Sequence, residues 1–411
     1  MTPPTAREKP ASLLDALTTD QLATPAPADA EQPGQAQSLG KGAAGVSLLH
    51  IERALAGLGT WATAHAWVRA ATRCEISAAE NAGLYVGAPA ISFVLHAAEA
   101  DEIPRYGRAL TRLDAHVASL AHRRVDAALA RIDRSEMPAF AEYDLFYGLT
   151  GIGQLLLRRA PGSDAFGRIL GHLVRLTEPL RIDGTWLPGW WASHDPDPLL
   201  PTPGGHANFG IAHGITGPLA LLAHAMRRGI IAEGHLGAIS EICAHLDAWR
   251  QDCESGPWWP QWITRDELRT GRVKQTSPLR PSWCYGTPGI ARAQQIAAIA
   301  TGDTSRQMMA EHALASCLSD PAQLRWITDT GLCHGWSGLY QTAWRAARDA
   351  LTPTISTRLP HLVELLTRHA EASEHHNAGL LDGTAGLVLA LQTAGRSTPP
   401  ISGWDSCLLI N

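Results

Sequence analysis

A short glycine motif that recurs along the chain constrains the fold more than any other feature of the sequence. Two glycines separated by two residues, or a near match, precede an apolar stretch rich in Ala and Leu seven times. The motifs begin at residues 42, 87, 148, 214, 286, 335 and 383. A unit of about 48 residues has room for two helices of ordinary length and two short loops. The repeat therefore predicts seven helical hairpins, or fourteen helices.

The repeated turn also bears on how the hairpins stack. Glycine lets another backbone approach closely, so each unit can enter its apolar helix by the same sharp turn. Regularly stacked hairpins form either an open solenoid or a closed ring. The first and last units are as apolar as the middle ones, so neither resembles a solvent-facing cap. This favours an all-α fold, an α/α toroid with inner and outer helix rings, over the open solenoid.

The chain divides into an arm and one large domain. Residues 1–40 are rich in Pro, Ala, Thr and Gln and have little periodic hydrophobicity, which predicts a mobile N-terminal arm. Residues 41–411 form a single toroid domain in this interpretation. Within it, residues 183–208 and 253–283 are rich in Gly, Pro and Trp and are expected to be rim loops. The alternating pattern of β-strands is nearly absent.

Charge and composition exclude several functional classes. A net charge of −5 and a pI near 6.4 argue against nucleic-acid binding, which needs a basic face. No apolar run reaches the ~18 residues of a membrane span, and the first residues show no secretory signal. Seven cysteines in 411 residues are an odd number, thinly spread. We therefore expect a cytoplasmic protein with metal-binding or reactive thiols and no disulfide scaffold.

Polar residues that precede the glycine motifs share positions across repeats. Cys284 and Cys333 stand two residues before the first glycine, His334 and His213 stand one before, and Asp144 stands four before. If every repeat begins its inner helix at the same turn, these side chains gather at one end of the ring. Zinc favours thiolate and imidazole ligands, and three protein ligands with an open fourth position are typical of a catalytic site. Calcium and magnesium prefer harder, oxygen ligands.

The register thus predicts a zinc site formed by Cys284, Cys333 and His334. The alternative is two buried, apolar cysteines and a hydrogen-bonded structural histidine. Five further cysteines are out of register and are interpreted as structural: Cys74, Cys243, Cys253, Cys317 and Cys407.

Four residues near these ligands are candidates for the chemistry. His213 is either a general acid/base or the cap of its own helix. Asp144 either orients that histidine or interacts with a helix dipole. Arg280 stands four residues before Cys284 and either stabilises a developing anion or pairs at the surface. Tyr285 follows Cys284 and either donates a hydrogen bond or packs.

Three motifs in the second half of the chain resemble those of the lanthionine synthetase C-like family, the lantibiotic cyclases. They are Ser-Trp-Cys-Tyr-Gly-Thr-Pro-Gly at 282–289, Cys-His-Gly-Trp-Ser-Gly at 333–338 and Gly-Leu-Leu-Asp-Gly-Thr-Ala-Gly at 379–386. The segments 144–148 and 212–214 match further family motifs, and the resemblance covers roughly residues 40–395. It implies an α/α toroid, zinc bound by Cys284, Cys333 and His334, and roles in turnover for His213, Asp144 and Arg280.

The resemblance also implies a substrate and partners. The family often has another functional histidine before the His-Gly motif, and His206 is the nearest candidate here. The chain has no room for a fused dehydratase, which is similar to the stand-alone cyclases. The implied substrate is a dehydrated precursor peptide, in which cysteine thiols add to dehydroalanine or dehydrobutyrine to form thioether rings. A complex with a separate dehydratase and an exporter is implied, with membrane association through that exporter.

Three other functions fit parts of the sequence. A protein of the same fold can instead add glutathione to dehydroamino acids. A peptide-binding scaffold with a structural zinc is a second alternative, although no third cysteine is in register. A toroidal glycosidase would need paired carboxylates, and Asp144 and Asp382 are the in-register pair that could supply them; the cysteines would then have no role.

Overall fold

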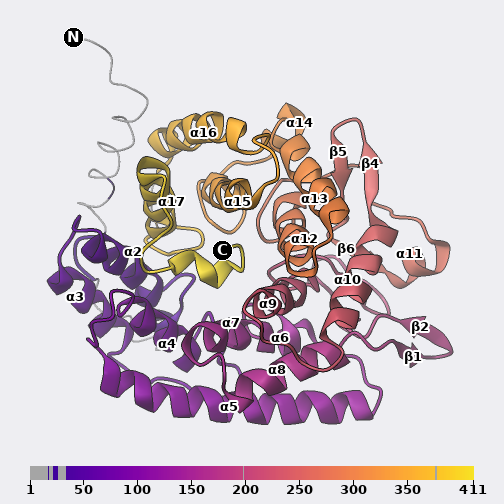
Figure 1. The fold of residues 1–411 in the computed structure, drawn as a ribbon, viewed down its shortest axis with the longest axis horizontal. Coiled ribbons are helices and arrows are strands. Elements are labelled where there is room, and N and C mark those ends of the chain that lie inside the picture. The colour runs from indigo at the N-terminus through magenta and orange to yellow at the C-terminus, as the bar shows by residue number, and fades with distance from the viewer. Residues whose placement is uncertain (1–16, 18–21, 26–33, 198, 375–376) are drawn as a thin grey trace.

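Two concentric rings of helices form most of the molecule (Figure 1). The computed structural model describes residues 17, 22–25, 34–197, 199–374 and 377–411. The inner ring consists of the helices that follow the glycine motifs: α2 (Ala43–Leu55), α4 (Ala88–Ala97), α7 (Leu149–Arg159), α9 (Thr216–Arg227), α12 (Thr287–Thr301), α15 (Trp336–Asp349) and α17 (Thr384–Arg396). The outer ring consists of α3 (Trp61–Ala71), α5 (Gly107–Asp133), α8 (Asp164–Arg175), α10 (His235–Trp249), α13 (Thr304–Cys317) and α16 (Leu359–Ala372). The α/α toroid expected from the repeat is confirmed.

Burial distinguishes the two rings. Residues 216–225 of α9 are all buried, as expected of a helix surrounded by other helices. The long outer helix α5 buries one face, with Leu110, Leu113, Val117 and Leu120 at helical spacing. The core therefore lies between the rings.

A closed series of backbone hydrogen bonds joins the seven turns. The residues two before each first glycine are Gly40, Tyr85, Phe146, Ala212, Cys284, Cys333 and Leu381. Five of them donate their N–H to the carbonyl of the corresponding residue in the next repeat: Tyr85 to Phe146, Ala212 to Cys284, Cys284 to Cys333, Cys333 to Leu381 and Leu381 to Gly40. Leu39 and Leu145, one position earlier, supply the two remaining links, to Tyr85 and Ala212. The helices α17 and α2 pack together, so the last repeat meets the first.

The second glycine of the motif is required by a close backbone approach. In six repeats, a Cβ at this position would collide with the carbonyl oxygen of the residue three before the first glycine; the glycines are Gly45, Gly151, Gly217, Gly289, Gly338 and Gly386. The second repeat has Ala90 at this place instead. The motif thus fixes how each inner helix leaves its turn, and so where the preceding side chains lie.

The C-terminal strap, residues 400–411, enters the centre of the ring (Figure 1). Trp404 and Cys407 within it are completely buried. Inner-ring side chains hold its backbone: Tyr85 Oη donates to the carbonyl of Cys407 at 3.0 Å, and Trp283 Nε1 donates to that of Leu408 at 2.9 Å. The strap therefore ties together repeats that are far apart in the sequence.

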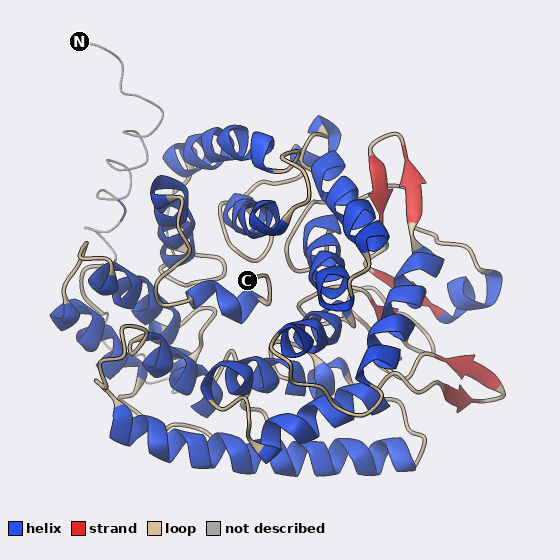
Figure 2. Ribbon diagram, in the orientation of Figure 1, coloured by secondary structure: helices blue, strands red, loops and turns tan. Residues whose placement is uncertain are grey.

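The structure departs from fourteen regular helices in two ways. Within the described residues, α17 is followed by the strap and its short 3-10 helix η3 (Trp404–Leu408), not by an outer helix. The rim loops contain short antiparallel strands, which lie at one side of the ring in Figure 2: β1 (Leu180–Ile182) with β2 (Thr185–Leu187), β3 (His206–Asn208) with β6 (Trp262–Thr264), and β4 (Gln251–Cys253) with β5 (Gly256–Trp258). The remaining short helices are η1 (Gln35–Gln37), α6 (Phe140–Tyr143), α11 (Arg265–Thr270), α14 (Pro321–Leu324) and η2 (Ser356–Arg358).

Much of the arm expected over residues 1–40 lies outside the described residues, at 1–16, 18–21 and 26–33. In its described part, Leu22 and Leu39 are completely buried. No helix in the described part of the chain combines the length and the apolar character that crossing a membrane requires.

Candidate metal centre and acid–base pair

Three side chains with metal-binding atoms lie together at the end of the ring where the turns meet. Cys284, Cys333 and His334 each offer one ligand atom, and these atoms lie within 4.8 Å of one another. The backbone bond from Cys284 N to the carbonyl of Cys333, 3.3 Å long, fixes the two turns that carry them. Cys284 is buried, whereas Cys333 and His334 are partly exposed. The cluster is thus anchored on one side and open on the other.

The chemistry of these donors fits a zinc ion, and their separations of up to 4.8 Å are somewhat longer than those of bound ligand atoms. Zinc binds thiolate sulfur at about 2.3 Å and imidazole nitrogen at about 2.0 Å, so tetrahedral ligand atoms lie up to about 4 Å apart. Hydrogen bonding from Cys333, and further bonds from His334 and Ser282, hold the pKa of the Cys284 thiol well below its usual range. The hydrogen bond that Cys333 donates to that thiolate, together with burial, raises the pKa of Cys333. The site therefore concentrates negative charge on sulfur, which is what a divalent cation stabilises.

Asp329 lies behind this cluster and was not among the residues predicted from the sequence. Its Oδ2 is 3.6 Å from His334 Nε2 and 3.8 Å from Arg280 Nη1. Its Oδ1 accepts a 2.9 Å hydrogen bond from Gly331 N, which fixes the carboxylate to its own turn. A carboxylate beside a ligand histidine orients the ring and raises its basicity. Arg280 is thereby placed next to the cluster, with 38 % of its side chain exposed.

The position of Asp329 recurs in other repeats, and this recurrence is a sequence signal from which Asp329 could have been predicted. Asn208, Asp329 and Asn377 all stand six residues before the first glycine of their motif. In each case, the side-chain Oδ1 accepts a hydrogen bond from the backbone N–H two residues later. Short polar side chains of this kind stabilise turns locally. Arg280 also stands six residues before the first glycine of its motif, in the repeat that lies between those of Asn208 and Asp329. Arg280 and Asp329 therefore come from equivalent positions in neighbouring turns.

Asp144 and His213 form a hydrogen-bonded pair at the same end of the ring. His213 Nδ1 lies 2.6 Å from Asp144 Oδ2. Asp144 is completely buried, and its other oxygen accepts 2.7 Å bonds from the backbone N–H groups of Tyr147 and Gly148. The carboxylate is therefore fixed from both sides. His213 keeps 22 % of its side chain exposed, so its remaining nitrogen can reach a substrate.

Aromatic rings surround His213. The ring centroids of Phe146 and Phe140 lie 4.7 and 5.0 Å from that of His213. Those of Tyr285 and Tyr147 lie 6.2 and 6.4 Å away. These rings limit the directions from which a substrate can approach and lower the local dielectric, which strengthens electrostatic interactions at the imidazole.

Tyr285 connects the cysteine cluster with the histidine. It follows Cys284 in the chain and its ring faces His213. Its hydroxyl accepts a 3.3 Å hydrogen bond from Asn208 Nδ2, and burial raises the pKa of its phenol. A neutral hydroxyl in this position is a hydrogen-bond donor.

His206 lies in β3, beside the pair but separate from it. It is completely buried, and its Nδ1 lies 2.9 Å from the carbonyl oxygen of His194. Burial lowers the pKa of His206 to about 4, so the ring is neutral near pH 7. Its ring meets Phe140 edge-on, 6.5 Å between centroids, whereas Phe140 also contacts His213. A role for His206 in turnover stays a prediction.

The cysteines outside the register are distributed through the fold. Cys243, Cys317 and Cys407 are buried, whereas Cys74 and Cys253 are exposed. Burial raises the pKa of the Cys243 thiol to about 11, which makes it unreactive.

The chain is similar to known proteins over most of its length. Residues 34–409 match the family model of the lanthionine synthetase C-like protein. The nisin biosynthesis protein NisC of Lactococcus lactis subsp. lactis is 25 % identical over 337 residues, which cover 80 % of this chain and 77 % of that protein. The solved structure of a nisin cyclase superposes with a TM-score of 0.77 at 20 % identity, covering 98 % of this chain and 96 % of that one.

Proposed function

Because this chain belongs to the lanthionine synthetase C-like family, we propose that it is a zinc-dependent lanthionine cyclase. Its substrate is a dehydrated precursor peptide, and its product contains lanthionine or methyllanthionine. The observation that carries the proposal is the meeting of two polar groups at one end of the ring. They are the Cys284, Cys333 and His334 cluster and the Asp144–His213 pair, which is bonded at 2.6 Å.

The cysteine cluster activates the nucleophile in this proposal. Zinc held by Cys284, Cys333 and His334 would supply Lewis acidity, which removes the proton of an incoming thiol whose free pKa is about 8.5. The two protein sulfurs keep the site electron-rich, so the thiolate stays nucleophilic. Asp329, whose Oδ2 lies 3.6 Å from His334 Nε2, orients the His334 ring.

The histidine pair completes the addition. The thiolate sulfur forms a bond to the β-carbon of the dehydro residue, and electron density moves onto the adjacent carbonyl as an enolate. Arg280 or the Tyr285 hydroxyl stabilises that oxygen. His213, oriented by Asp144, delivers a proton to the α-carbon. One thiol and one alkene become one thioether, so the reaction needs no redox cofactor.

A thiol count tests this function. The dehydrated peptide is incubated with the protein and then alkylated with iodoacetamide. A cyclase makes substrate thiols resistant to alkylation, while the mass of the unalkylated peptide does not change. Thiols that stay fully alkylatable at the rate seen without protein contradict the proposal.

Glutathione addition is distinguished by mass. Adding glutathione to the same incubation raises the peptide mass by one glutathione for each dehydro residue if this alternative holds. Ring closure leaves the mass unchanged. A peptide-binding scaffold binds the peptide and changes neither the mass nor the thiol count.

The partners in this proposal are the dehydrated precursor peptide, a separate dehydratase and an exporter. The cytoplasm supplies reduced thiols on both substrate and enzyme, which the chemistry needs. Co-purification of the tagged protein with the dehydratase tests the complex.

A further inference from the structure

A cavity of 710 Å³ is lined by no residue of the cysteine cluster or of the Asp144–His213 pair. One face of each of three helices lines it. The lining residues in these helices follow helical spacing: His65, Val68 and Arg69 in α3, with Thr72 directly after its end; Ala88, Ile91 and Leu95 in α4; and Ala109, Arg112, Leu113 and His116 in α5. We call this cavity the α3–α5 groove.

The groove exists because two outer helices are held apart. The helix α3 packs on α2 and α4, whereas α5 packs on α4, α7 and α8. At one end a side-chain contact joins the walls: His65 Nδ1 lies 3.1 Å from Tyr106 Oη, and the two rings stack. Between the walls, Ile91 and Leu95 of α4 form an apolar floor.

The rim of the groove is basic, although the chain is acidic overall. Among the residues that the structure describes, Arg69 and Arg112 pair with no carboxylate. Two other arginines of α5 are paired with carboxylates: Arg123 with Glu80 at 2.7 Å and Arg131 with Glu142 at 2.9 Å. Glu75 is the one acidic residue among those that line the groove. An apolar floor with unpaired guanidinium groups is complementary to a ligand that has both apolar and acidic groups.

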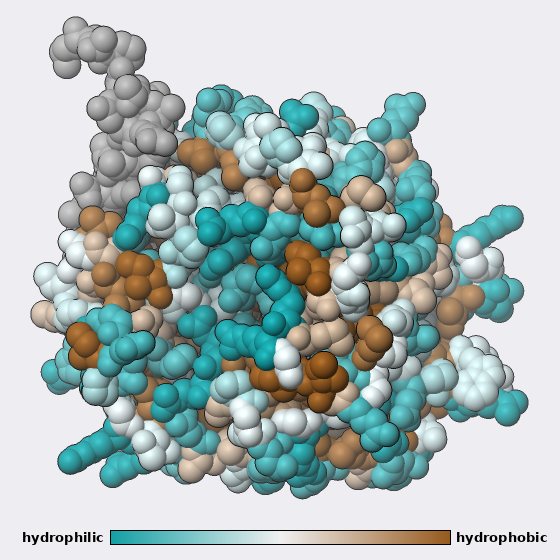
Figure 3. Space-filling model, in the orientation of Figure 1, coloured by the Kyte–Doolittle hydropathy of each residue, from teal (hydrophilic) through white to brown (hydrophobic). Residues whose placement is uncertain are grey.

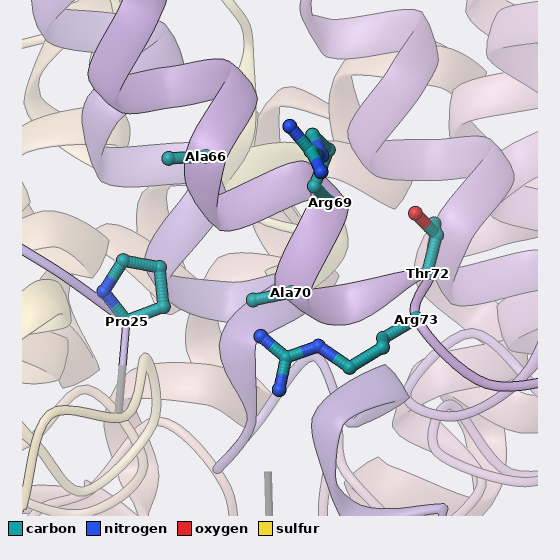
Figure 4. A pocket seen from close by; sticks show the side chains of 6 residues that line it. All are labelled: Pro25, Ala66, Arg69, Ala70, Thr72 and Arg73. Atoms are coloured by element: carbon teal, nitrogen blue, oxygen red, sulfur yellow. The ribbon is translucent and has the colours of Figure 1, made fainter. Parts of the chain in front are cut away.

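The described N-terminal residues lie against α3 at a second cavity, of 480 Å³. Pro25 lines this cavity, and the Arg73 side chain extends toward Ala70 and Pro25 (Figure 4). Arg69 and Thr72 line both this cavity and the groove. Nearby, Trp67 Nε1 donates a 3.1 Å hydrogen bond to the carbonyl of Leu22. Neither Leu22 nor Pro25 lines the groove.

The groove reaches the end of the ring that carries the chemistry. Ala88, which lines it, is the first residue of α4 and follows Tyr85 by three residues. Tyr85 stacks on Phe146 at 4.1 Å, and Phe146 in turn lies 4.7 Å from the His213 ring. The start of α4, at one edge of the groove, is therefore linked to the Asp144–His213 pair through the rings of Tyr85 and Phe146.

We propose that the α3–α5 groove docks an acidic, apolar-bearing segment of the peptide substrate that lies outside its ring-forming part. This docking role rests on the proposed function, in which the substrate is a peptide. The groove holds one segment in place while the reacting cysteines exchange at the metal centre. Peptides recognised in this way place apolar side chains at regular spacing into the floor and carboxylates on the rim.

The exposed thiol of Cys74 lines the groove and serves as the probe. The full chain is treated with a limiting amount of iodoacetamide, alone or with a synthetic peptide of alternating Leu and Asp, and alkylation is mapped by mass spectrometry. Cys253, exposed in β4, is the internal control. We expect the Leu/Asp peptide to slow alkylation of Cys74 and not of Cys253. A Leu/Lys peptide should not protect Cys74.

Charge-reversal variants test the rim. Replacing both rim arginines (Arg69→Glu with Arg112→Glu) should weaken protection of Cys74 about tenfold in peptide concentration. Arg272→Glu, at an exposed arginine outside the groove, should leave it unchanged. Protection of Cys74 from alkylation does not require ring formation. The docking proposal can therefore fail while the cyclase proposal holds, and the reverse. In that assay, the double variant should still cyclise a short dehydrated peptide that lacks an acidic segment.

Two results overturn the proposal. One is equal protection of Cys74 by the Leu/Asp and Leu/Lys peptides, or by neither. The other is that Cys74 in the full chain is slow to react until residues 1–33 are removed, which would mean that the chain's own N-terminal segment covers the groove.

Discussion

At Asp144 a single carboxylate has two tasks, and the two oxygens divide them. One oxygen accepts the backbone N–H groups of Tyr147 and Gly148, and the other lies against His213. The first task shapes the turn and the second orients the imidazole. A substitution that keeps the first acceptor can therefore separate structure from chemistry.

We expect Asp144→Asn to slow ring formation by roughly 10²–10⁴-fold, the range of general acid–base contributions. The amide oxygen can still accept both turn hydrogen bonds, so the melting temperature should change little. Its NH₂ group cannot accept a hydrogen bond from the N–H of His213 Nδ1. Mass spectrometry of alkylated peptide against time gives the rate; a variant that cyclises as fast as the parent contradicts the role of Asp144.

We expect Cys284→Ala to lose the metal and the ring-forming activity together. Removing a buried thiolate takes away one of three ligands, and the remaining pair binds zinc weakly. Circular dichroism should show an unchanged helix content, because the alanine keeps the backbone link to Cys333. Cys253→Ser removes an exposed thiol in β4 and should keep full zinc content by atomic emission.

Asp329→Asn should lower the zinc affinity 10- to 100-fold, the usual range for a group behind a metal ligand. The amide has the size of the carboxylate but not its charge beside His334 Nε2 and Arg280. Competition with a chelator measures the affinity without any enzyme assay. Asp382→Asn is the matched control: it removes an exposed carboxylate near Cys333 without removing a partner of His334. An equal loss in both variants would indicate a general charge effect.

At the residue scale, the sequence predicted the cluster better than its surroundings. Cys284, Cys333 and His334 could be grouped because a repeat converts sequence position into spatial position. Asp329 was missed because only positions one, two and four before the glycine were compared, and it stands six before. The aromatic rings around His213 come from different turns and carry no common sequence signal.

At the scale of one element, the glycine turn sets the position of everything that precedes it. A Cβ at Gly338 would collide with the Leu332 carbonyl, one residue before Cys333. The turn that holds a metal ligand and the packing of α15 are therefore one structural unit.

We expect Gly338→Ala to destabilise the protein by about 1–3 kcal/mol, as forced overpacking does, and to lower the zinc content as Cys333 moves. Gly237→Ala is the control. Gly237 lies in α10 with open space around its Cα, so alanine there should stabilise by about 0.5–1 kcal/mol. Urea denaturation measures both. Equal effects of the two changes would show that the turn has no special requirement for glycine.

The helices were more predictable than the strands and the strap. Inner and outer helices have long periodic patterns and recurrent turns. The strands have three residues each, which is too short for a period of two to be seen. The strap was missed because its hydrogen bonds go to residues distant in sequence, such as Trp283.

At the scale of the whole molecule, the toroid buries several histidines. Burial lowers their pKa values to about 4 or below; among them are His50, His96, His172, His206, His224 and His245. The unfolded chain, with histidine pKa values near 6.5, binds more protons than the folded chain below that pH.

We expect the protein to lose stability as the pH falls from 6.5 toward 4, and to show no such histidine effect above 6.5. A histidine that stays neutral in the folded chain contributes a loss of at most about 1.4 kcal/mol for each pH unit in that window. His245→Phe should flatten the dependence, because His245 stacks on Phe209 and its Nε2 has no partner in the described part of the chain. His361→Gln, at a 60 % exposed side chain, should not. Melting temperatures across this pH range give the answer.

The surface shows how the centre of the ring meets solvent. Hydrophilic residues gather around the place where Figure 1 marks the C-terminus (Figure 3). Arg292 and Arg345 lie there, paired with Asp349 and Asp405. The strap is therefore held by the pair of Arg345 with the buried Asp405 and by a hydrogen bond from Arg292 Nε to the carbonyl of Ile410, as well as by apolar packing.

A circle of hairpins has neither a first nor a last member. In a linear array, the terminal units fray, and proteases and solvent hydrogen exchange begin there. Here, the backbone of each turn is hydrogen-bonded to both neighbouring turns. Breaking the hydrogen bond between any two turns would therefore expose both of them to solvent. Hydrogen exchange should therefore be similarly slow at the hydrogen-bonded amides of all seven turns. Proteolysis should not yield partly folded fragments that have lost one terminal repeat.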